Sequence, residues 1–205
     1  MHSYGASTLI TYIRPLPSIN DFGNQKDRAS DLYISKEQAQ LNAMRELSKL
    51  TKTSKDFNDF LPLTLKSIIR CIGLDRCMFL MLTGDKKQVQ SRFSYDRSGD
   101  DDSFKVKIDI VSSKNIISYL IRTDNAAVIN DYHELKWRDY ITRDLAKLID
   151  KGAICLAPVQ ISNNTIGMIV GQRFTKATKI SVDEHQEFCF LIEHLNMCLT
   201  TVSRR

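Results

Sequence analysis

The stretch GAICLAPVQISNNTIGMIVGQRF, Gly152 to Phe174, decides the fold of this 205-residue chain. It contains two apolar runs, Ala153 to Ile161 and Thr165 to Phe174, joined by the polar residues SNNT. Asn163 and Asn164 adopt the positive φ angles of a tight turn more readily than most residues, so the pattern predicts a β-hairpin. The first strand is apolar on both of its sides. We therefore expect the hairpin to lie centrally in a sheet that is covered from both faces.

Helices are predicted on both sides of this hairpin. After it, Val182 to Val202 has apolar residues at the three- and four-residue steps of a helix that faces a core. Before it, Asp31 to Lys52 forms a helix with a narrow apolar stripe, and Asp56 to Ile72 a second helix with a wide apolar face. We expect Pro62 near the first turn of the second helix and Gly73 at its end.

The segments between the second helix and the hairpin are mostly short strands. They are predicted at Arg76 to Leu82, Gln88 to Tyr95, residues 104–108 and Ala126 to Ile129, with a short helix over Asn115 to Arg122. Most of these strands follow one another too closely for parallel crossovers. The fold class is therefore α+β, with a central antiparallel sheet. We expect the N- and C-terminal helices on one face of the sheet, and short helices and loops on the other.

Residues 1–30 differ from the rest of the chain. They contain two of the four prolines and two of the eight glycines without a sustained period, which predicts a tail or linker. The alternative is a strap that packs on the domain through its few apolar residues. The domain itself is expected at residues 31–205.

Composition indicates a globular protein, with 42% hydrophobic and 26% charged residues. The net charge is +5, but basic and acidic residues are interspersed, which argues against a nucleic-acid partner. The longest apolar run, Cys77 to Leu82, is far too short to span a membrane. We find no secretory signal and expect a cytoplasmic location. The five cysteines have no CxxC spacing and are expected to be buried thiols.

Two segments resemble the GAF domain. Gly73 to Leu82, GLDRCMFLML, is similar to the family's helix-to-strand passage, and the hairpin is similar to its "vPl…g..iGvl" motif, with Pro158 and Gly167 in place. The resemblance covers about Asp31 to Val202 and is closest to bacterial signalling proteins with HD-related output domains. In those an Asp-Arg pair often ends the hairpin, where Gln172 and Arg173 stand here.

The resemblance implies a non-catalytic sensory or regulatory module with a ligand pocket over the sheet. Which ligand or cofactor it takes is not defined by the sequence. The set of residues that is typical of cyclic-nucleotide-binding members is absent. The pair Asn130-Asp131 is the part of this sequence most similar to it. Bilin-binding members have a cysteine near a histidine, and His133 has no cysteine beside it.

Six residues are predicted to line such a pocket. The irregular segment Asn130 to Lys151 forms its lid, and polar contacts come from the strands. The six are Tyr132, Trp137 and Tyr140 as walls, with Arg92, Tyr95 and Arg173 as polar contacts. The alternative is that these aromatic residues merely close the core beneath a long loop.

Metal binding and catalysis are not expected. His185 and His194 lie nine residues apart on one helix and so point to opposite sides, which excludes a shared metal ion. The enzymatic GAF family, the free methionine sulfoxide reductases, has a cysteine-containing loop before the hairpin. Residues 130–151 contain no cysteine.

The outer helices are the expected partner surface. Besides its core stripe, the last helix has a second line of Phe190, His194, Met197 and Thr201. We expect a homodimer through the first and last helices; the alternative is that the N-terminal tail covers them. A ligand-free dimerisation scaffold remains the second functional candidate.

Overall fold

The computed structural model describes residues 35–100, 105–111, 114–131, 133–143, 145–146, 152–174 and 179–205. From Ser35 onward the chain forms one compact unit. The expected tail at residues 1–30 lies outside the described residues, as does Tyr132.

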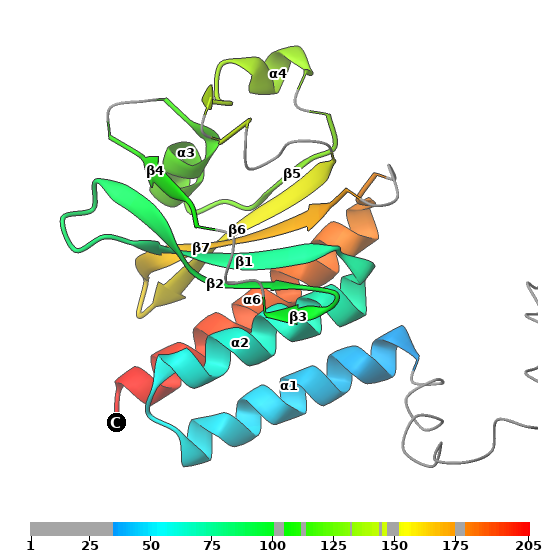
Figure 1. Ribbon diagram of the computed structural model, residues 1–205. Coiled ribbons are helices and arrows are strands. Elements are labelled where there is room, and N and C mark those ends of the chain that lie inside the picture. The colour runs from blue at the N-terminus through cyan, green and yellow to red at the C-terminus, as the bar shows by residue number, and fades with distance from the viewer. Residues whose placement is uncertain are drawn as a thin grey trace, which may run out of the picture. The chain divides into compact units, whose positions relative to one another are not determined.

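A single antiparallel sheet organises the domain. Its strands are β1 (Arg76–Leu82), β2 (Gln88–Asp96), β3 (Gly99–Asp100), β4 (Lys107–Asp109), β5 (Ala127–Ile129), β6 (Ala153–Ile161) and β7 (Asn164–Arg173). The order across the sheet is β3-β2-β1-β7-β6-β5, and β4 also pairs with β2. The β6–β7 hairpin therefore lies between β1 and β5, in the central position expected from its sequence (Figure 1).

The hairpin turn lies one residue earlier than predicted. Ser162 and Asn163 have φ angles of 48° and 66°, and both are positive, as a type I′ turn requires. Asn164 is already paired with Ile161, so it belongs to β7. The backbone N–H of Ser162 donates to the hydroxyl of Thr200, which ties the turn to the last helix.

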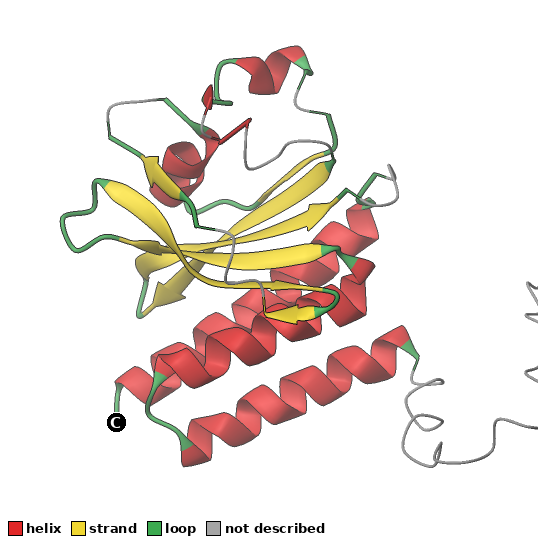
Figure 2. Cartoon of the chain, in the orientation of Figure 1, coloured by secondary structure: helices red, strands yellow, loops and turns green. Residues whose placement is uncertain are grey.

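Helices cover both faces of the sheet, which confirms the predicted fold class (Figures 1 and 2). On one face lie α2 (Phe57–Ile68), its continuation η3 (Ile69–Gly73) and α6 (Val182–Ser203). On the other lie α3 (Ile116–Thr123) and α4 (Leu135–Arg138). We call these two sides of the sheet the α6 face and the α3 face.

The first helix, α1 (Lys36–Thr53), forms an outer layer. It packs on α2 and α6 rather than directly on the sheet (Figure 1). Ala43 and Leu47 are buried in this contact, whereas Leu41 is 42% exposed. The predicted stripe on this helix is therefore divided between packing inside the chain and contact with solvent.

The second helix differs from the prediction at its proline. Asp56 caps α2 by accepting a hydrogen bond from the N–H of Asn58, so the helix begins at Phe57 and Pro62 falls in its second turn. There its missing N–H removes one helical hydrogen bond. Gly73 ends the helical stretch as predicted, with a φ of +72° that favours glycine.

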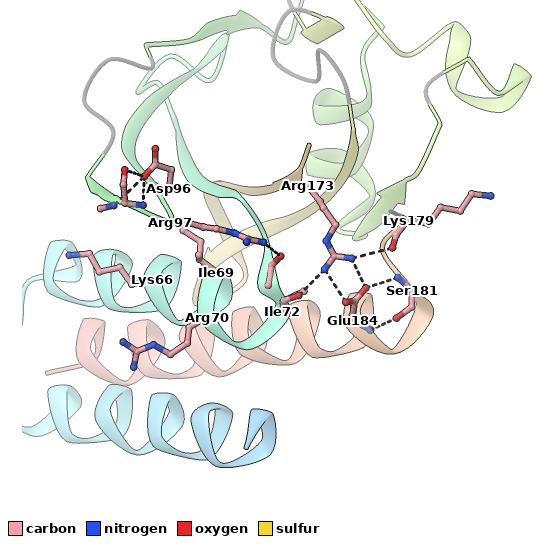
Figure 3. Close-up of a pocket in the computed structure, with 13 residues that line it drawn as sticks. Lys66, Ile69, Arg70, Ile72, Asp96, Arg97, Arg173, Lys179, Ser181 and Glu184 are labelled. Carbon is pink, nitrogen blue, oxygen red and sulfur yellow. Dashed lines mark hydrogen bonds and ion pairs between the residues drawn. The ribbon is translucent and has the colours of Figure 1, made fainter. Parts of the chain in front are cut away.

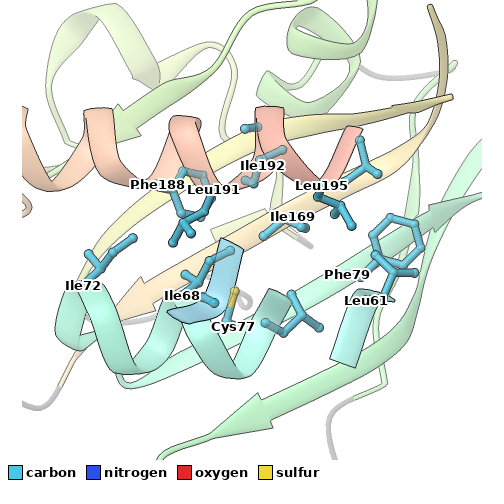
Figure 4. Packing of buried hydrophobic residues seen from close by; sticks show 14 of the residues in the cluster. Leu61, Ile68, Ile72, Cys77, Phe79, Ile169, Phe188, Leu191, Ile192 and Leu195 are labelled. Atoms are coloured by element: carbon cyan, nitrogen blue, oxygen red, sulfur yellow. The ribbon is translucent and has the colours of Figure 1, made fainter. Parts of the chain in front are cut away.

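Two apolar clusters lie on opposite sides of the sheet. The cluster on the α6 face contains Cys77 and Phe79 of β1, and Figure 4 shows such residues between helices and sheet. The apolar stripe of α6 belongs to it, as its spacing predicts. The cluster on the α3 face contains Met78 and Leu80, the alternate residues of β1. Both faces of the central strands are thus covered.

A β-bulge in β2 changes which face its side chains occupy. Phe79 pairs with Phe93 and Leu80 with Ser91, which leaves Arg92 without a partner in β1. Phe93 consequently packs in the cluster on the α6 face, whereas Val89 lies on the α3 face. Odd-numbered residues of this strand therefore do not share one face.

Among the described residues, no helix has the length and hydrophobicity that crossing a bilayer requires.

Candidate functional site

Most of the α3 face is apolar and filled by the chain itself. Buried residues from the four adjacent strands β1, β7, β6 and β5 form this floor: Met78, Leu80, Ala127, Ile129, Ile154, Leu156, Met168 and Val170. Ile117 and Leu120 of α3 pack against it. The space over this part of the sheet is therefore already occupied by side chains.

One end of the α3 face is polar. Arg76 at the start of β1 pairs with Asp96 of β2 on one side and Gln172 of β7 on the other. Ser94 is paired with Met78, one step further along the same face. Paired residues on neighbouring strands point to the same side of a sheet. Four polar side chains therefore lie together beside an apolar floor.

The Ser94 hydroxyl is the unusual member of this group. Ser94 is 9% exposed, and its Oγ is buried without a hydrogen-bond partner in the described part of the chain. A buried polar atom without a partner costs about 1–3 kcal/mol. Gln172 beside it is also buried, at 3% exposure. This end of the sheet therefore offers buried polar groups of the kind that position a ligand.

The two charged members of the group have defined surroundings. The guanidinium of Arg76 lies 5.4 Å from the ring centre of Phe174. The carboxylate of Asp96 accepts hydrogen bonds from the Ser98 hydroxyl and from the backbone N–H groups of Ser98 and Gly99. These bonds, and the nearby charge of Arg76, lower the pKa of Asp96. Asp96 is thus ionised and engaged within its own turn.

Two of the predicted wall residues lie on the α3 face. Trp137 of α4 and Tyr140, just after it, are half-buried and pack against the apolar cluster there. The Tyr140 ring lies 5.6 Å from that of Tyr119 on α3, and its carbonyl accepts a hydrogen bond from the N–H of Ile116. These contacts hold the segment after α4 close to α3.

The structure does not bring the predicted residues together. Tyr95 lies in the cluster on the α6 face, with the Lys66 ammonium 4.5 Å from its ring centre. Arg173 also points to that side, towards α6 (Figure 3). Arg92 is exposed at the bulge. Because the sheet separates its two faces, Tyr95 and Arg173 do not line a pocket shared with Trp137.

Arg173 forms a buried junction on the α6 face. Its guanidinium donates two hydrogen bonds of 2.9 Å to the carboxylate of Glu184 on α6, and others to the carbonyls of Ile72 and Lys179 (Figure 3). The hydrogen bonds from Arg173 lower the pKa of Glu184 to about 2. Glu184 also completes a capping box with Ser181. This ion pair therefore ties the end of β7 to the start of α6 and the end of η3.

A groove of about 940 Å³ lies beside this junction (Figure 3). We call it the basic groove because five basic residues line it, against two acidic ones, Asp96 and Glu184. The basic residues come from the second helix, the β2–β3 turn, the end of β7 and the approach to α6: Lys66, Arg70, Arg97, Arg173 and Lys179.

Sequence reasoning found only Arg173 among the residues of the basic groove. The others are spread over three distant segments in which acidic residues are interspersed, so no local pattern marks them. It also missed Arg76, Ser94 and Gln172. A signal existed for Arg76 and Gln172, because each is a polar residue near the end of a strand that is mostly apolar. Ser94 lies in a mostly polar strand, so its sequence context does not mark it.

In the described residues the cysteines and histidines form one thiol–imidazole contact and no metal site. No disulfide forms among the cysteines, and four of the five are buried. Burial raises the pKa of Cys77 and Cys155 well above the usual value, so both are protonated thiols. His194 contacts the Met44 carbonyl on α1, whereas His185 lies 3.6 Å from the Cys189 sulfur. No group of three metal-ligating side chains occurs in the part described.

No protein-family model matches this sequence, and no curated protein matches it. Solved structures are similar to it at low sequence identity. A phycoerythrobilin-bound GAF domain from a cyanobacterial phytochrome is 11% identical, with a TM-score of 0.65 over 84% of this chain and 98% of that one. The GAF domain/HD domain protein from Geobacter sulfurreducens is 15% identical, with a TM-score of 0.60 over 78% and 99%.

A third similar structure, residues 122 to 287 of a methyl-accepting chemotaxis protein, is 11% identical. Its TM-score is 0.62 over 77% of this chain and 97% of that one. Proteins this distant share a fold and not necessarily a ligand. The antiparallel sheet between α2 and α6 on one face and α3 and α4 on the other is, on this evidence, the fold of a GAF domain.

Proposed function

We propose that this chain is a non-catalytic sensory GAF module that binds a small molecule on the α3 face of its sheet. The observation that supports this most directly is the buried Ser94 hydroxyl, which has no partner in the described residues. It lies beside Arg76 and Gln172, at the edge of an apolar floor. Ligand sites combine a mostly apolar lining with a few polar groups of this kind.

The proposed ligand has a polar or anionic group and an apolar body. The polar group binds the Arg76 guanidinium and forms hydrogen bonds with the side chains of Ser94 and Gln172. The apolar body packs at the edge of the floor, beside Met78, which pairs with Ser94. Trp137 and Tyr140 close the α4 side of the same face. Several of the similar structures are GAF domains of signalling proteins, and one of them binds phycoerythrobilin.

Native mass spectrometry of the freshly purified protein tests this proposal first. A mass excess that disappears on denaturation is expected if a ligand copurifies, and its size identifies the chemical class. Arg76→Met should abolish the excess, because it removes the charge beside Ser94 and Gln172. Arg45→Met, an exposed position on α1, makes the same change far from the site and should keep the excess.

Protein without bound mass is then screened by thermal shift against nucleotides and other small metabolites. A ligand of the α3 face should raise the midpoint of unfolding of the wild type and of the Arg45→Met variant, but not of Arg76→Met. If no compound does so, the chain acts as a ligand-free dimerisation scaffold. An equal response of both variants contradicts the proposed site.

We propose further that the module dimerises through α1 and α6. Four large apolar side chains are exposed on these helices: Leu41 on α1, and Val182, Phe190 and Met197 on α6. Phe190 and Met197 lie about one turn on either side of His194, whose ring contacts α1 at the Met44 carbonyl. A strip of exposed apolar surface along two adjacent helices fits a second copy of the same strip.

A thiol enzyme is the opposing candidate. Catalysis by Cys155 requires a thiolate, and burial raises its pKa far above neutrality. We therefore expect no reduction of free methionine sulfoxide by the wild-type protein in the presence of dithiothreitol. Turnover that is lost in Cys155→Ser would contradict the non-catalytic assignment.

A further inference from the structure

We infer that a cavity between α3 and the β1–β2 hairpin is a second binding site, specific for a small carboxylate with an apolar body. The cavity has a volume of about 430 Å³, which lies within the range of small-molecule sites. Its described lining comes from the end of β1, the β1–β2 turn, the two residues after β4, and α3 with the segment just before it (Figure 1). We call it the α3 cavity.

The α3 cavity is distinct from the ligand site proposed above. Arg76 is the first residue of β1, and Leu82, which lines the cavity, is the last. The seven residues of β1 span about 20 Å, so the two sites lie at opposite ends of this strand. None of Arg76, Ser94 and Gln172 is among the described residues that line the cavity.

One part of the α3 cavity is apolar. Leu82, Ile110 and Ile121 line it, are half-buried, and pack against the apolar cluster of the α3 face. Val111 lines it as well and is 66% exposed. A ligand that covers these side chains removes apolar surface from water, which favours a ligand with an apolar body.

Ser118 brings a polar group to the same cavity. This residue of α3 is only 8% exposed. Its backbone N–H donates to the side chain of Asn115, and its carbonyl accepts a hydrogen bond from Arg122. Its hydroxyl has no hydrogen-bond partner in the described part of the chain. Because polar groups of buried residues are normally paired, this hydroxyl is a group that a ligand in the cavity can satisfy.

A cationic side chain lies on either side of Ser118 in the sequence. Arg122 follows it by one helical turn, and the Arg122 Nε donates to the Ser118 carbonyl at 3.3 Å. This bond holds the guanidinium near Ser118 and leaves its two terminal nitrogens for another acceptor. Lys114 precedes Ser118 by four residues and lies next to Asn115, which caps α3. Neither cation pairs with a carboxylate in the described residues, and the described lining contains no acidic residue.

These groups together define the class of ligand. A carboxylate accepts hydrogen bonds from a guanidinium and from a hydroxyl, and charge-assisted bonds of this kind are among the strongest in proteins. The apolar part of the lining favours an aliphatic or aromatic body. A polyanion would place further charges against Leu82, Ile110 and Ile121, and a hydrocarbon would leave the Ser118 hydroxyl without a partner.

Isothermal titration calorimetry with sodium octanoate tests this inference. The full chain is titrated at a constant ionic strength of about 0.15 M, because exposed charges are screened by salt. We expect a Kd below about 1 mM. Acetate has the carboxylate without the apolar body, and 1-octanol has the body without the charge, so both should bind at least about tenfold more weakly. No binding of octanoate, or equal affinity for octanoate and either analogue, would overturn the inference.

A charge-matched pair of double variants locates the site. Lys114→Gln with Arg122→Gln should weaken octanoate binding at least about tenfold. Lys49→Gln with Lys52→Gln removes the same net charge from exposed positions on α1 and should change the affinity less than about twofold. Circular dichroism verifies that both variants fold. An equal loss in the two variants would mean that the anion responds to net charge, and the inference would fail.

Ser118→Ala tests the uncharged contact. It removes a hydroxyl that has no partner in the described residues, so the thermal midpoint of unfolding without ligand should stay the same. Octanoate binding should be weaker by about threefold or more, because the carboxylate loses one donor. An unchanged affinity would show that the carboxylate does not lie at Ser118, and would overturn the assigned site.

The proposed function fails or succeeds separately. Arg76→Met acts at the other end of β1, so octanoate binding should be unchanged in it. A ligand of the proposed function shows the reverse pattern, since Arg76→Met abolishes its binding and the Lys114 and Arg122 double variant keeps it. A loss of octanoate binding in Arg76→Met would place the carboxylate beside Ser94 and overturn the inference of a second site.

Discussion

At the scale of single residues, Gly167 shows why part of the hairpin motif is specific. A Cβ added at Gly167 would lie 2.3 Å from the carbonyl oxygen of Leu80 and 2.6 Å from the ring of Phe79. Both neighbours belong to β1, which pairs with β7 along this stretch. The close approach of Phe79 across the strand therefore demands glycine, which the hairpin sequence alone does not reveal.

Gly167→Ala should lower the free energy of unfolding by about 1–3 kcal/mol, because the backbone of β1 must move to admit the methyl group. Gly84→Ala is the matched control, since nothing lies within 4 Å of a Cβ at that position. Urea denaturation of both variants measures the difference. Similar stability of the two would contradict the steric explanation.

A second residue-scale prediction concerns the charge of Glu184. Arg173 lowers its pKa from the usual 4.5 to about 2, so the unfolded chain binds a proton there more readily than the folded chain. The pair therefore stabilises the fold above pH 4.5, and this contribution is lost as the pH falls towards 2.

Glu184→Gln removes that charge and should destabilise the protein by about 1–3 kcal/mol at neutral pH. The difference from wild type should shrink as the pH falls from 4.5 towards 2, because wild-type Glu184 then becomes protonated. Urea denaturation at pH 7, 5, 4 and 3 measures both curves. Curves that stay parallel over this range would contradict the assigned ion pair.

At the scale of elements, the narrow apolar stripe of α1 is buried in one part and exposed in another. Leu47 is fully buried against α2 and α6, whereas Leu41 on the same stripe is 42% exposed. The helix with this stripe was expected to take part in a homodimer interface with the last helix. Leu47 packs in the chain's own core, and Leu41 lies on the exposed side, where the dimer is proposed.

Leu47→Ala should lower the free energy of unfolding by about 2–4 kcal/mol, because it leaves a cavity between three helices. Leu41→Ala should cost less than about 1 kcal/mol, since little apolar area is lost from a half-exposed site. Chemical denaturation of both variants under identical conditions gives the comparison. Equal losses would show that α1 does not pack as described.

At the scale of the whole molecule, the sheet separates two chemically different sides. The α3 face has an apolar floor with a polar end, and the α6 face has three helices and the basic groove. Arg173 joins β7 to α6 and so connects the sheet to the helices of the α6 face. The proposed dimer interface on α1 and α6 lies on the same side as this junction.

Met197→Asp should convert the proposed dimer to a monomer, because it places a charge in the apolar strip of α6 at a residue that is 60% exposed. Val111→Asp, at a residue that is 66% exposed outside these helices, is the matched control and should remain dimeric. Sedimentation velocity at several protein concentrations shows whether each variant is a monomer or a dimer. A wild type that is monomeric throughout would contradict the proposed interface.

Much of the fold was predictable because its signals are local. The period of apolar residues marks helices and strands within a few residues, and the two-sided apolar pattern of β6 correctly placed the hairpin in the centre of the sheet. The errors have physical causes as well. The turn lies one residue earlier because Asn164 pairs with Ile161, and Pro62 lies in a second turn because Asp56 caps the helix.

The candidate site was less predictable, because the register between strands decides which side chains from distant segments meet. The six predicted pocket residues were chosen by chemical type and by position along the chain. Five of them are described, and the structure divides them between two faces, with Tyr95 on one and Trp137 on the other. The bulge at Arg92 is one reason, because an extra residue in β2 reverses which side its neighbours occupy.

By itself, then, the sequence determined the order of helices and strands, the α+β class, and the central position of the hairpin, because these follow from patterns within short segments. The tertiary structure alone decided that Arg76, Ser94 and Gln172 meet on one face, and that Arg70 and Lys179 line one groove. Such groups are brought together by pairing and packing between distant segments, which no local pattern records.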